Sequence, residues 1–155
     1  MEIIFVETKY IKKMNNYTYT FETSRSAKEI FELLLTIKKW WSGIHNETIT
    51  GNSLQLNDEF SFSAGGGMHF SKQKLVELIP DTKIVWLVTE SNLSFLDNPT
   101  EWENTKLVFN IFEKGGKTHV QFSHVGLNQQ IECYEGCSTA WTQYLHNLKN
   151  KLNSI

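Results

Sequence analysis

The chain has 155 residues, a formal net charge of −2 at pH 7 and an isoelectric point near 6.2. This length fits one domain, which buries roughly 70% of the surface that its unfolded chain exposes. The charge balance gives no basic surface that could follow a nucleic-acid backbone, so nucleic acid is not an expected partner. No segment is apolar for long enough to cross a bilayer, so no membrane partner is expected either.

The first thirteen residues, MEIIFVETKYIKK, do not fit a secretory signal. They contain only a four-residue apolar run, with acidic residues on both sides and no small-residue cleavage site. We therefore expect a cytoplasmic protein. In that compartment the thiols of Cys133 and Cys137 are expected to remain reduced.

The N-terminal part of the chain predicts one strand followed by two helices. Residues 16–23, NYTYTFET, are β-branched and aromatic with alternation, as is typical of a strand. Ser26 and Glu29 have the spacing of a capping box, which starts a helix that ends near Thr36. The stretch from Lys38 to Trp41 begins a second, short helix.

The middle of the chain predicts a run of antiparallel strands joined by short turns. Turn-forming pairs and triplets such as Gly51-Asn52 and Gly65-Gly66-Gly67 separate them. In the segment 82–90 both faces are apolar, so the pattern leaves open which one points inward. The expected strands are 47–50, 58–64, 68–79, 82–90, 103–113 and 117–126.

The C-terminal part predicts one long amphipathic helix. Apolar side chains from Ile131 to Leu152 recur every three or four residues, over about six turns. A helix of that length can cover the whole apolar face of a sheet.

Several stretches in this order resemble the START-related, birch-pollen-allergen-like (SRPBCC) superfamily, and within it the branch named after the activator of heat-shock-protein-90 ATPase homologue. The stretches are KKWW, KQKLVELIPDTKIVWLVTES, EWENTKLVFNI, THVQFSHVGL and ECYEGCSTAW. The resemblance implies an α+β helix-grip fold: a curved antiparallel sheet of about six to seven strands wrapped around a long C-terminal helix, with two short helices after the first strand. It also implies one domain over residues 14–155, with residues 1–13 as an N-terminal extension.

Members of this superfamily enclose a cavity between the sheet and the last helix. The resemblance therefore implies an aromatic ligand-binding wall, with His124 as the main polar contact. Trp102 also falls on a recurrent aromatic position of the family. The predicted ligand-binding residues are Trp41, Phe62, Trp86, Phe109, Phe122, His124 and Trp141.

The cluster of His124, Cys133 and Cys137 is a candidate metal site. The two cysteines are four residues apart and could join His124 in a set of three ligands, but a fourth ligand is missing and the spacing is not CxxC. We therefore expect no metal and no cofactor, with both cysteines acting as small buried packing residues.

These observations favour a protein that binds a small hydrophobic or aromatic molecule, as a monomer or a homodimer. The first alternative is a cavity-based enzyme of the cyclase, dehydratase or hydrolase type, with no catalytic residue assigned; its acid-base candidates are His69, Glu77, Glu101 and His124. Glu101 and Glu103 are more simply interpreted as solvated acids at a strand edge. The second alternative is a partner that activates a chaperone ATPase.

Overall fold

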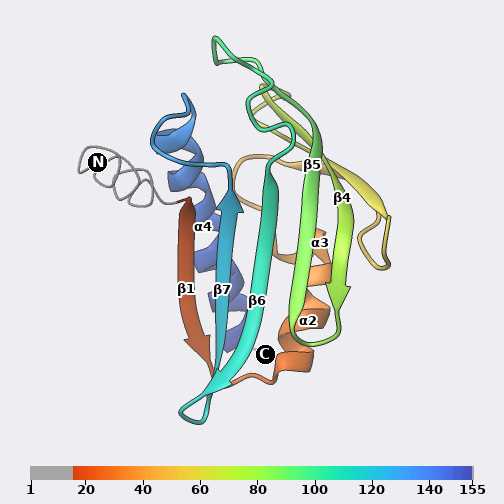
Figure 1. Ribbon diagram of the computed structural model, residues 1–155, viewed down its shortest axis with the longest axis vertical. Helices are drawn as coiled ribbons and strands as arrows, with labels where there is room; N and C mark the ends of the chain where they lie inside the picture. Colours follow the sequence, from red (N-terminus) through yellow and green to blue (C-terminus); the bar gives the residue numbers. More distant parts are fainter. Residues whose placement is uncertain (1–15, 155) are drawn as a thin grey trace, which may run out of the picture.

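The computed structural model describes residues 16–154, which form a seven-stranded antiparallel sheet and three helices (Figure 1). The strands are β1 (Tyr17–Thr23), β2 (Thr48–Gly51), β3 (Glu59–Ala64), β4 (His69–Ile79), β5 (Lys83–Leu93), β6 (Lys106–Lys114) and β7 (Lys117–Val125). The helices are α2 (Ala27–Leu35), α3 (Ile37–Trp40) and α4 (Tyr134–Asn153). The predicted helix-grip class and order of elements are confirmed.

The sheet has the strand order β1-β7-β6-β5-β4-β3-β2, so the first strand pairs with the last. Every other neighbouring pair follows the chain order, as expected for a meander. The register of β4 against β5 shifts at Lys72/Gln73 and again at Leu75/Glu77. Such bulges bend a strand, and these help to curve the sheet around α4.

The capping box predicted at the start of α2 is present. The Ser26 hydroxyl accepts from the amide of Glu29 at 3.1 Å, and the Glu29 carboxylate accepts from the amide of Ser26 at 3.2 Å. These two bonds satisfy amides that a helix start leaves without partners. They fix the point where the chain leaves β1, so that Ile30 and Leu34 enter the core.

The inward face of β5, which the sequence left open, carries Ile84, Trp86 and Val88, all at most 1% exposed. The indole N–H of Trp86 donates to the Ser53 hydroxyl at 2.7 Å, which satisfies its only polar group. The ring packs edge-on against Phe109, with centroids 5.9 Å apart. This side of the sheet therefore belongs to the core.

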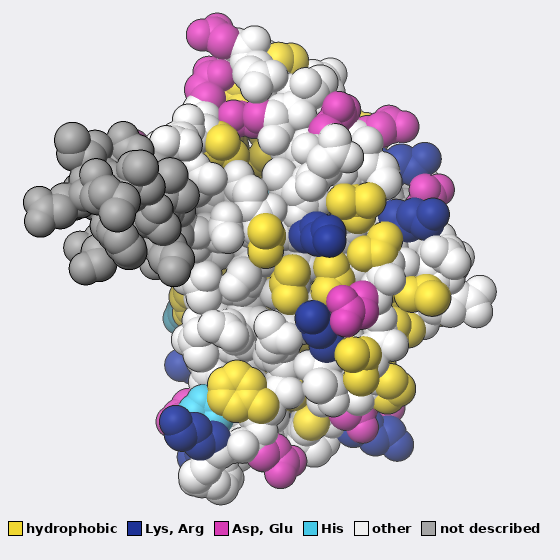
Figure 2. Space-filling model, viewed as in Figure 1, with side chains coloured by type: hydrophobic (Ala, Val, Ile, Leu, Met, Phe, Trp, Pro, Cys, Tyr) yellow, Lys and Arg dark blue, Asp and Glu magenta, His cyan; other side chains and the backbone are white. Residues whose placement is uncertain are grey.

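Helix α4 lies across the concave face of the sheet and is seen behind the strands in Figure 1. Its buried face consists of Cys137, Trp141, Tyr144, Leu145, Leu148 and Leu152. The opposite face of the sheet, shown in Figure 2, has hydrophobic side chains interspersed with charged ones. The two faces of the sheet thus have different roles, and the aromatic core lies between the concave face and α4.

Three element boundaries differ from the sequence prediction by three residues. Helix α4 starts at Tyr134 and not at Ile131, β6 starts at Lys106 and not at residue 103, and β5 ends at Leu93 and not at residue 90. Residues 94–105 form turns, in which Asn104 has a φ of 67° and the amide of Thr105 donates to the carbonyl of Trp102. Positive φ interrupts an extended strand, which explains the later start.

The expected extension at residues 1–13 lies outside the described residues. Among the helices of the described part, none is both long and apolar enough to cross a membrane.

Candidate functional site

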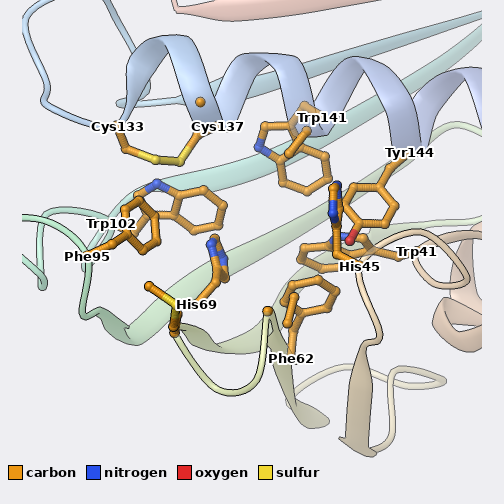
Figure 3. A pocket seen from close by; sticks show the side chains of 15 residues that line it. Trp41, His45, Phe62, His69, Phe95, Trp102, Cys133, Cys137, Trp141 and Tyr144 are labelled. Carbon is orange, nitrogen blue, oxygen red and sulfur yellow. A yellow bond between two sulfur atoms is a disulfide. The ribbon is translucent and has the colours of Figure 1, made fainter.

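A cavity of about 270 Å³ lies between the first turns of α4 and the ends of β3 and β4 (Figure 3). The turn at residues 65–68 and the loop after β5 complete its rim, to which they contribute Met68 and Phe95. Both rim side chains are about half exposed, whereas the aromatic residues deeper in the cavity are nearly fully buried. The cavity therefore opens to solvent at the rim and ends in the core.

The wall is built from aromatic rings that pack on one another. Trp41 stacks on Phe62 with a centroid distance of 4.4 Å and lies 4.9 Å from Trp141. Trp102 lies parallel to Trp141 at 6.2 Å. No Asp, Glu, Lys or Arg lines the part of the cavity formed by residues 16–154. An apolar wall of stacked rings favours contact with another flat, apolar surface.

One side of the cavity is fixed by Glu47, whose carboxylate accepts from the amides of Gly43 and His45 at 2.7 Å each. It also accepts from the Tyr144 hydroxyl at 2.5 Å. Burial alone would raise the pKa of Glu47, but these hydrogen bonds outweigh it and lower the pKa. Burial, followed by the bond to Glu47, raises the pKa of Tyr144. The Tyr144 hydroxyl therefore stays protonated, and its proton is used in the hydrogen bond to Glu47.

Two polar side chains in the wall have a ring nitrogen without a hydrogen-bond partner among the described residues. They are Nε2 of His69 and Nε1 of Trp102, and both atoms are buried. The rings meet edge to face at 4.7 Å. Burial, with a smaller contribution from His45, lowers the pKa of His69 to about 4. His69 is thus a neutral imidazole at pH 7, and its ring points into the cavity (Figure 3).

His124, expected to be the polar contact for a ligand, is fully buried and satisfied on both ring nitrogens. Nδ1 accepts from the indole N–H of Trp141 at 3.1 Å, and Nε2 pairs with the Thr105 hydroxyl at 2.9 Å. Because the Thr105 hydroxyl itself donates to the carbonyl of Trp102, the network assigns the proton of His124 to Nε2. Burial, then His69, lowers the pKa of His124 to about 3.

The structure brings together only part of the predicted ligand wall. Trp41, Phe62 and Trp141 line the cavity. The other four predicted residues face the same core but have no surface on the cavity, because neighbouring rings and α4 cover them; they are Trp86, Phe109, Phe122 and His124. Ligand contact by the first three remains a prediction.

Cys133 and Cys137 are joined by a disulfide on the cavity wall, so the expectation that both thiols are reduced differs from the structure. Their expected burial is observed, at 3% and 4% exposure. With the sulfurs bonded to each other and both nitrogens of His124 occupied, the three residues offer no set of metal ligands as arranged. Within residues 16–154, no group of three His, Cys, Asp or Glu side chains converges as metal ligands would.

The acidic candidates are placed apart from one another. The Glu101 carboxylate accepts from the amides of Cys133 and Glu132 at 2.8 and 3.0 Å, just before α4. Glu103 accepts from the amide of Ser91 at 3.3 Å, and Glu77 pairs with Lys83 at 3.5 Å. The predicted position of Glu101 and Glu103 at a strand edge is therefore wrong: both lie in turns, where their partly exposed carboxylates accept from backbone amides.

Sequence reasoning missed several wall residues because they lie in turns or alternate with core positions. The sequence indicates Trp102 only as a recurrent aromatic of the family, and His69 only as an acid-base candidate. The inward-facing alternation of β4 could have indicated His69, since Ser71 and Gln73 share its face and are buried. No sequence pattern locates Met68 or Phe95 at a rim.

A curved sheet gripping a long helix, with an aromatic cavity beneath the start of that helix, defines a helix-grip domain of the SRPBCC type. Residues 24–153 match the family model described as "Activator of Hsp90 ATPase homolog 1-like protein". The chain belongs to this family, and the predicted superfamily and branch are confirmed. Comparison with curated proteins gave no match.

Solved structures share the fold at low sequence identity. The Aha1 dimer from Colwellia psychrerythraea is 24% identical, with a TM-score of 0.71 over 90% of this chain and 97% of that one. Protein Ms6760 from Mycobacterium smegmatis is 12% identical, with a TM-score of 0.68 over 92% and 93% of the two chains. DynU16, from the dynemicin biosynthetic locus, is 8% identical, with a TM-score of 0.61 over 89% of this chain and 47% of that one.

Proposed function

We propose that this protein binds a small, uncharged aromatic molecule in the cavity between the sheet and α4. The observation that carries the proposal is the wall itself: stacked indole and phenyl rings, with no charged side chain on the described lining. Exposing such a surface to water is unfavourable, and a flat apolar ligand removes it from water.

The volume limits the size of the ligand. An engineered cavity of about 150 Å³ lined by apolar side chains holds benzene. At about 270 Å³, this cavity is less than twice that size and falls near the lower end of natural ligand sites. One or two fused rings fit this space, whereas a long lipid chain does not.

His69 supports one polar contact in an otherwise apolar site. A neutral imidazole offers one donor and one acceptor, and its buried Nε2 has no partner within the described chain. A single hydroxyl or carbonyl on the ligand would complete that bond. A carboxylate or an ammonium group would instead be buried without a counter-charge, at a much larger cost. We therefore expect neutral ligands to be preferred over charged ones.

The direct test titrates the protein with 1-naphthol and with naphthalene. Binding is monitored by the indole N–H signals of the protein in heteronuclear NMR. We expect 1-naphthol to shift the signals of Trp102 and Trp141 and to saturate with a Kd of about 100 µM, as roughly 0.5 kcal/mol per non-hydrogen atom gives. Unchanged indole signals at saturating concentrations of both probes would overturn the proposal.

A matched pair of variants on α4 provides the control. Ala140 lines the cavity, so Ala140→Phe should fill it and abolish binding. Thr139 is exposed on the solvent side of the same helix, so Thr139→Phe adds the same ring without entering the cavity. Equal affinity of the two variants for 1-naphthol would show that the probe binds elsewhere.

The setting we propose is a cytoplasmic domain that acts as a monomer or a homodimer. The Colwellia relative is described as a dimer and shares the fold, which supports testing self-association here. Light scattering after size exclusion separates the two states directly.

A further inference from the structure

The disulfide between Cys133 and Cys137 occupies a distinctive place on the cavity wall. Cys133 is the N-cap of α4 and Cys137 lies one turn later, with both sulfurs on the cavity side of the helix (Figure 3). The two residues are almost completely shielded from bulk solvent. A reagent that reaches the sulfurs therefore approaches through the cavity.

This bond contributes little to holding the fold together. It closes a loop of one helical turn, which the bond from the Cys137 amide to the Cys133 carbonyl, 2.7 Å long, already fixes. Cross-links over such short loops remove little entropy from the unfolded chain. The start of α4 is also held by Glu101, through the amides of Glu132 and Cys133. The disulfide and dithiol forms are thus both compatible with the same fold.

Trp102 directs a hydrogen-bond donor toward the two sulfurs. Its indole nitrogen points toward the disulfide in Figure 3, is buried and has no acceptor among the described residues. An indole N–H can only donate, and a thiolate accepts such a bond much better than a disulfide sulfur does because it carries a full charge. Glu101 already occupies the amide of Cys133 and adds negative charge there, so Trp102 is the donor left to stabilise a leaving thiolate.

We propose that Cys133 and Cys137 form a thiol–disulfide exchange site, reached from the cavity, that reacts with a low-molecular-weight thiol and with the corresponding disulfide. The inference is independent of the ligand-binding proposal. Trp102 is assigned as the donor that stabilises the sulfur released during exchange.

The exchange proceeds through two successive displacements at sulfur. The thiolate of a first small thiol attacks one cysteine sulfur, which breaks the Cys133–Cys137 bond, forms a mixed disulfide and releases the other cysteine as a thiolate that takes up a proton. The thiolate of a second small thiol then attacks the small-molecule sulfur of the mixed disulfide, which forms the oxidised small molecule and releases the second cysteine as a thiolate that also takes up a proton. Two electrons and two protons pass from two thiols to the protein, and oxidised small molecule reverses both steps.

The test uses reduced and oxidised glutathione as the probe, with alkylation and mass measurement to count free thiols. We expect the wild type to convert fully and reversibly between zero and two alkylated cysteines. Trp102→Phe should slow reduction roughly tenfold, since a hydrogen bond to a charged leaving group is lost. The control is Trp40→Phe, whose N–H donates to the carbonyl of Leu34 and whose ring does not line the cavity; it should stay within about twofold of the wild type.

Two further variants keep the proposal testable if Trp102→Phe does not fold. Cys137→Ser removes the resolving sulfur, so glutathione should accumulate as a mixed disulfide on Cys133. Ala140→Phe should slow reduction because it fills the route through the cavity, while Thr139→Phe should not. Each of three results would overturn the proposal. The first is a wild-type disulfide that stays intact in a large excess of reduced glutathione. The others are the absence of an adduct on Cys137→Ser and equal reduction rates for Ala140→Phe and Thr139→Phe.

Discussion

At the scale of single residues, the two histidines that face the aromatic core have different roles. His124 resembled a ligand contact in sequence because it ends an alternating apolar strand, yet both of its nitrogens are occupied within the core. His69 lies at the cavity, with one nitrogen that has no partner among residues 16–154. Alternation alone identifies which face a histidine occupies, but only three-dimensional neighbours decide whether its nitrogens are free.

His124→Leu should reduce the free energy of unfolding by about 2–4 kcal/mol, because it leaves the indole N–H of Trp141 and the Thr105 hydroxyl without a buried partner. Urea denaturation at pH 7 measures this change. His119→Leu serves as the control, since His119 lies on the opposite face of β7 and remains partly exposed. Equal losses in the two variants would contradict the structural role of His124.

His69→Phe should remove the preference for a hydroxylated ligand while keeping the apolar wall. Because one hydrogen bond contributes about 1 kcal/mol, we expect 1-naphthol to bind the wild type roughly fivefold more tightly than naphthalene does. In the variant the two probes should bind equally, as titration by NMR would show. A preference that survives in the variant would remove His69 as the polar contact.

At the scale of elements, α4 begins where another segment caps it. Cys133 occupies the N-cap position but makes no side-chain capping bond, and the Glu101 carboxylate takes two amides at this end instead. A carboxylate near a helix N-terminus also interacts favourably with the helix dipole. The loop that contains Trp102 is therefore coupled to the start of α4.

Glu101→Gln should lower the free energy of unfolding by about 1–2 kcal/mol, as the loss of a charged cap does. Thermal unfolding monitored by circular dichroism measures the effect. Glu113→Gln is the matched control, because Glu113 is exposed at the far end of β6. A melting temperature for Glu101→Gln that matches the control would mean that the cap contributes little.

Element order and sheet class could be predicted from the sequence because they follow from local periodicity and short turns. The alternation in β6 and β7 and the apolar repeat of α4 are examples. The site could be predicted only in part. The Glu101 cap and the position of Trp102 depend on a turn over residues 94–105, whose long-range bonds leave no periodic pattern.

At the scale of the whole molecule, acid should destabilise the fold through His69, which is partly buried, and His124, which is fully buried. Their pKa values fall from an ordinary 6.5 to about 4 for His69 and about 3 for His124, chiefly through burial. Below pH 6.5 the unfolded chain binds protons that the folded chain does not. The stability is therefore complete above pH 6.5 and is lost as the pH falls toward these folded values.

Between pH 7.5 and pH 5, the free energy of unfolding should drop by about 4 kcal/mol, with each histidine contributing about half. Urea denaturation across this range gives the slope directly. His69→Gln should reduce the drop by about half, since it removes one of the two groups. An unchanged slope in that variant would show that other groups control the acid response.

The rim and the depth of the cavity belong to different kinds of segment. Met68 and Phe95 lie in turns, whereas Trp41 and Trp141 belong to the packed core. Under the proposed function, substitutions at the rim would change which molecule enters at little cost to folding, while substitutions in the depth affect the scaffold itself. Such a division would let ligand preference change through two short loops on an unchanged framework.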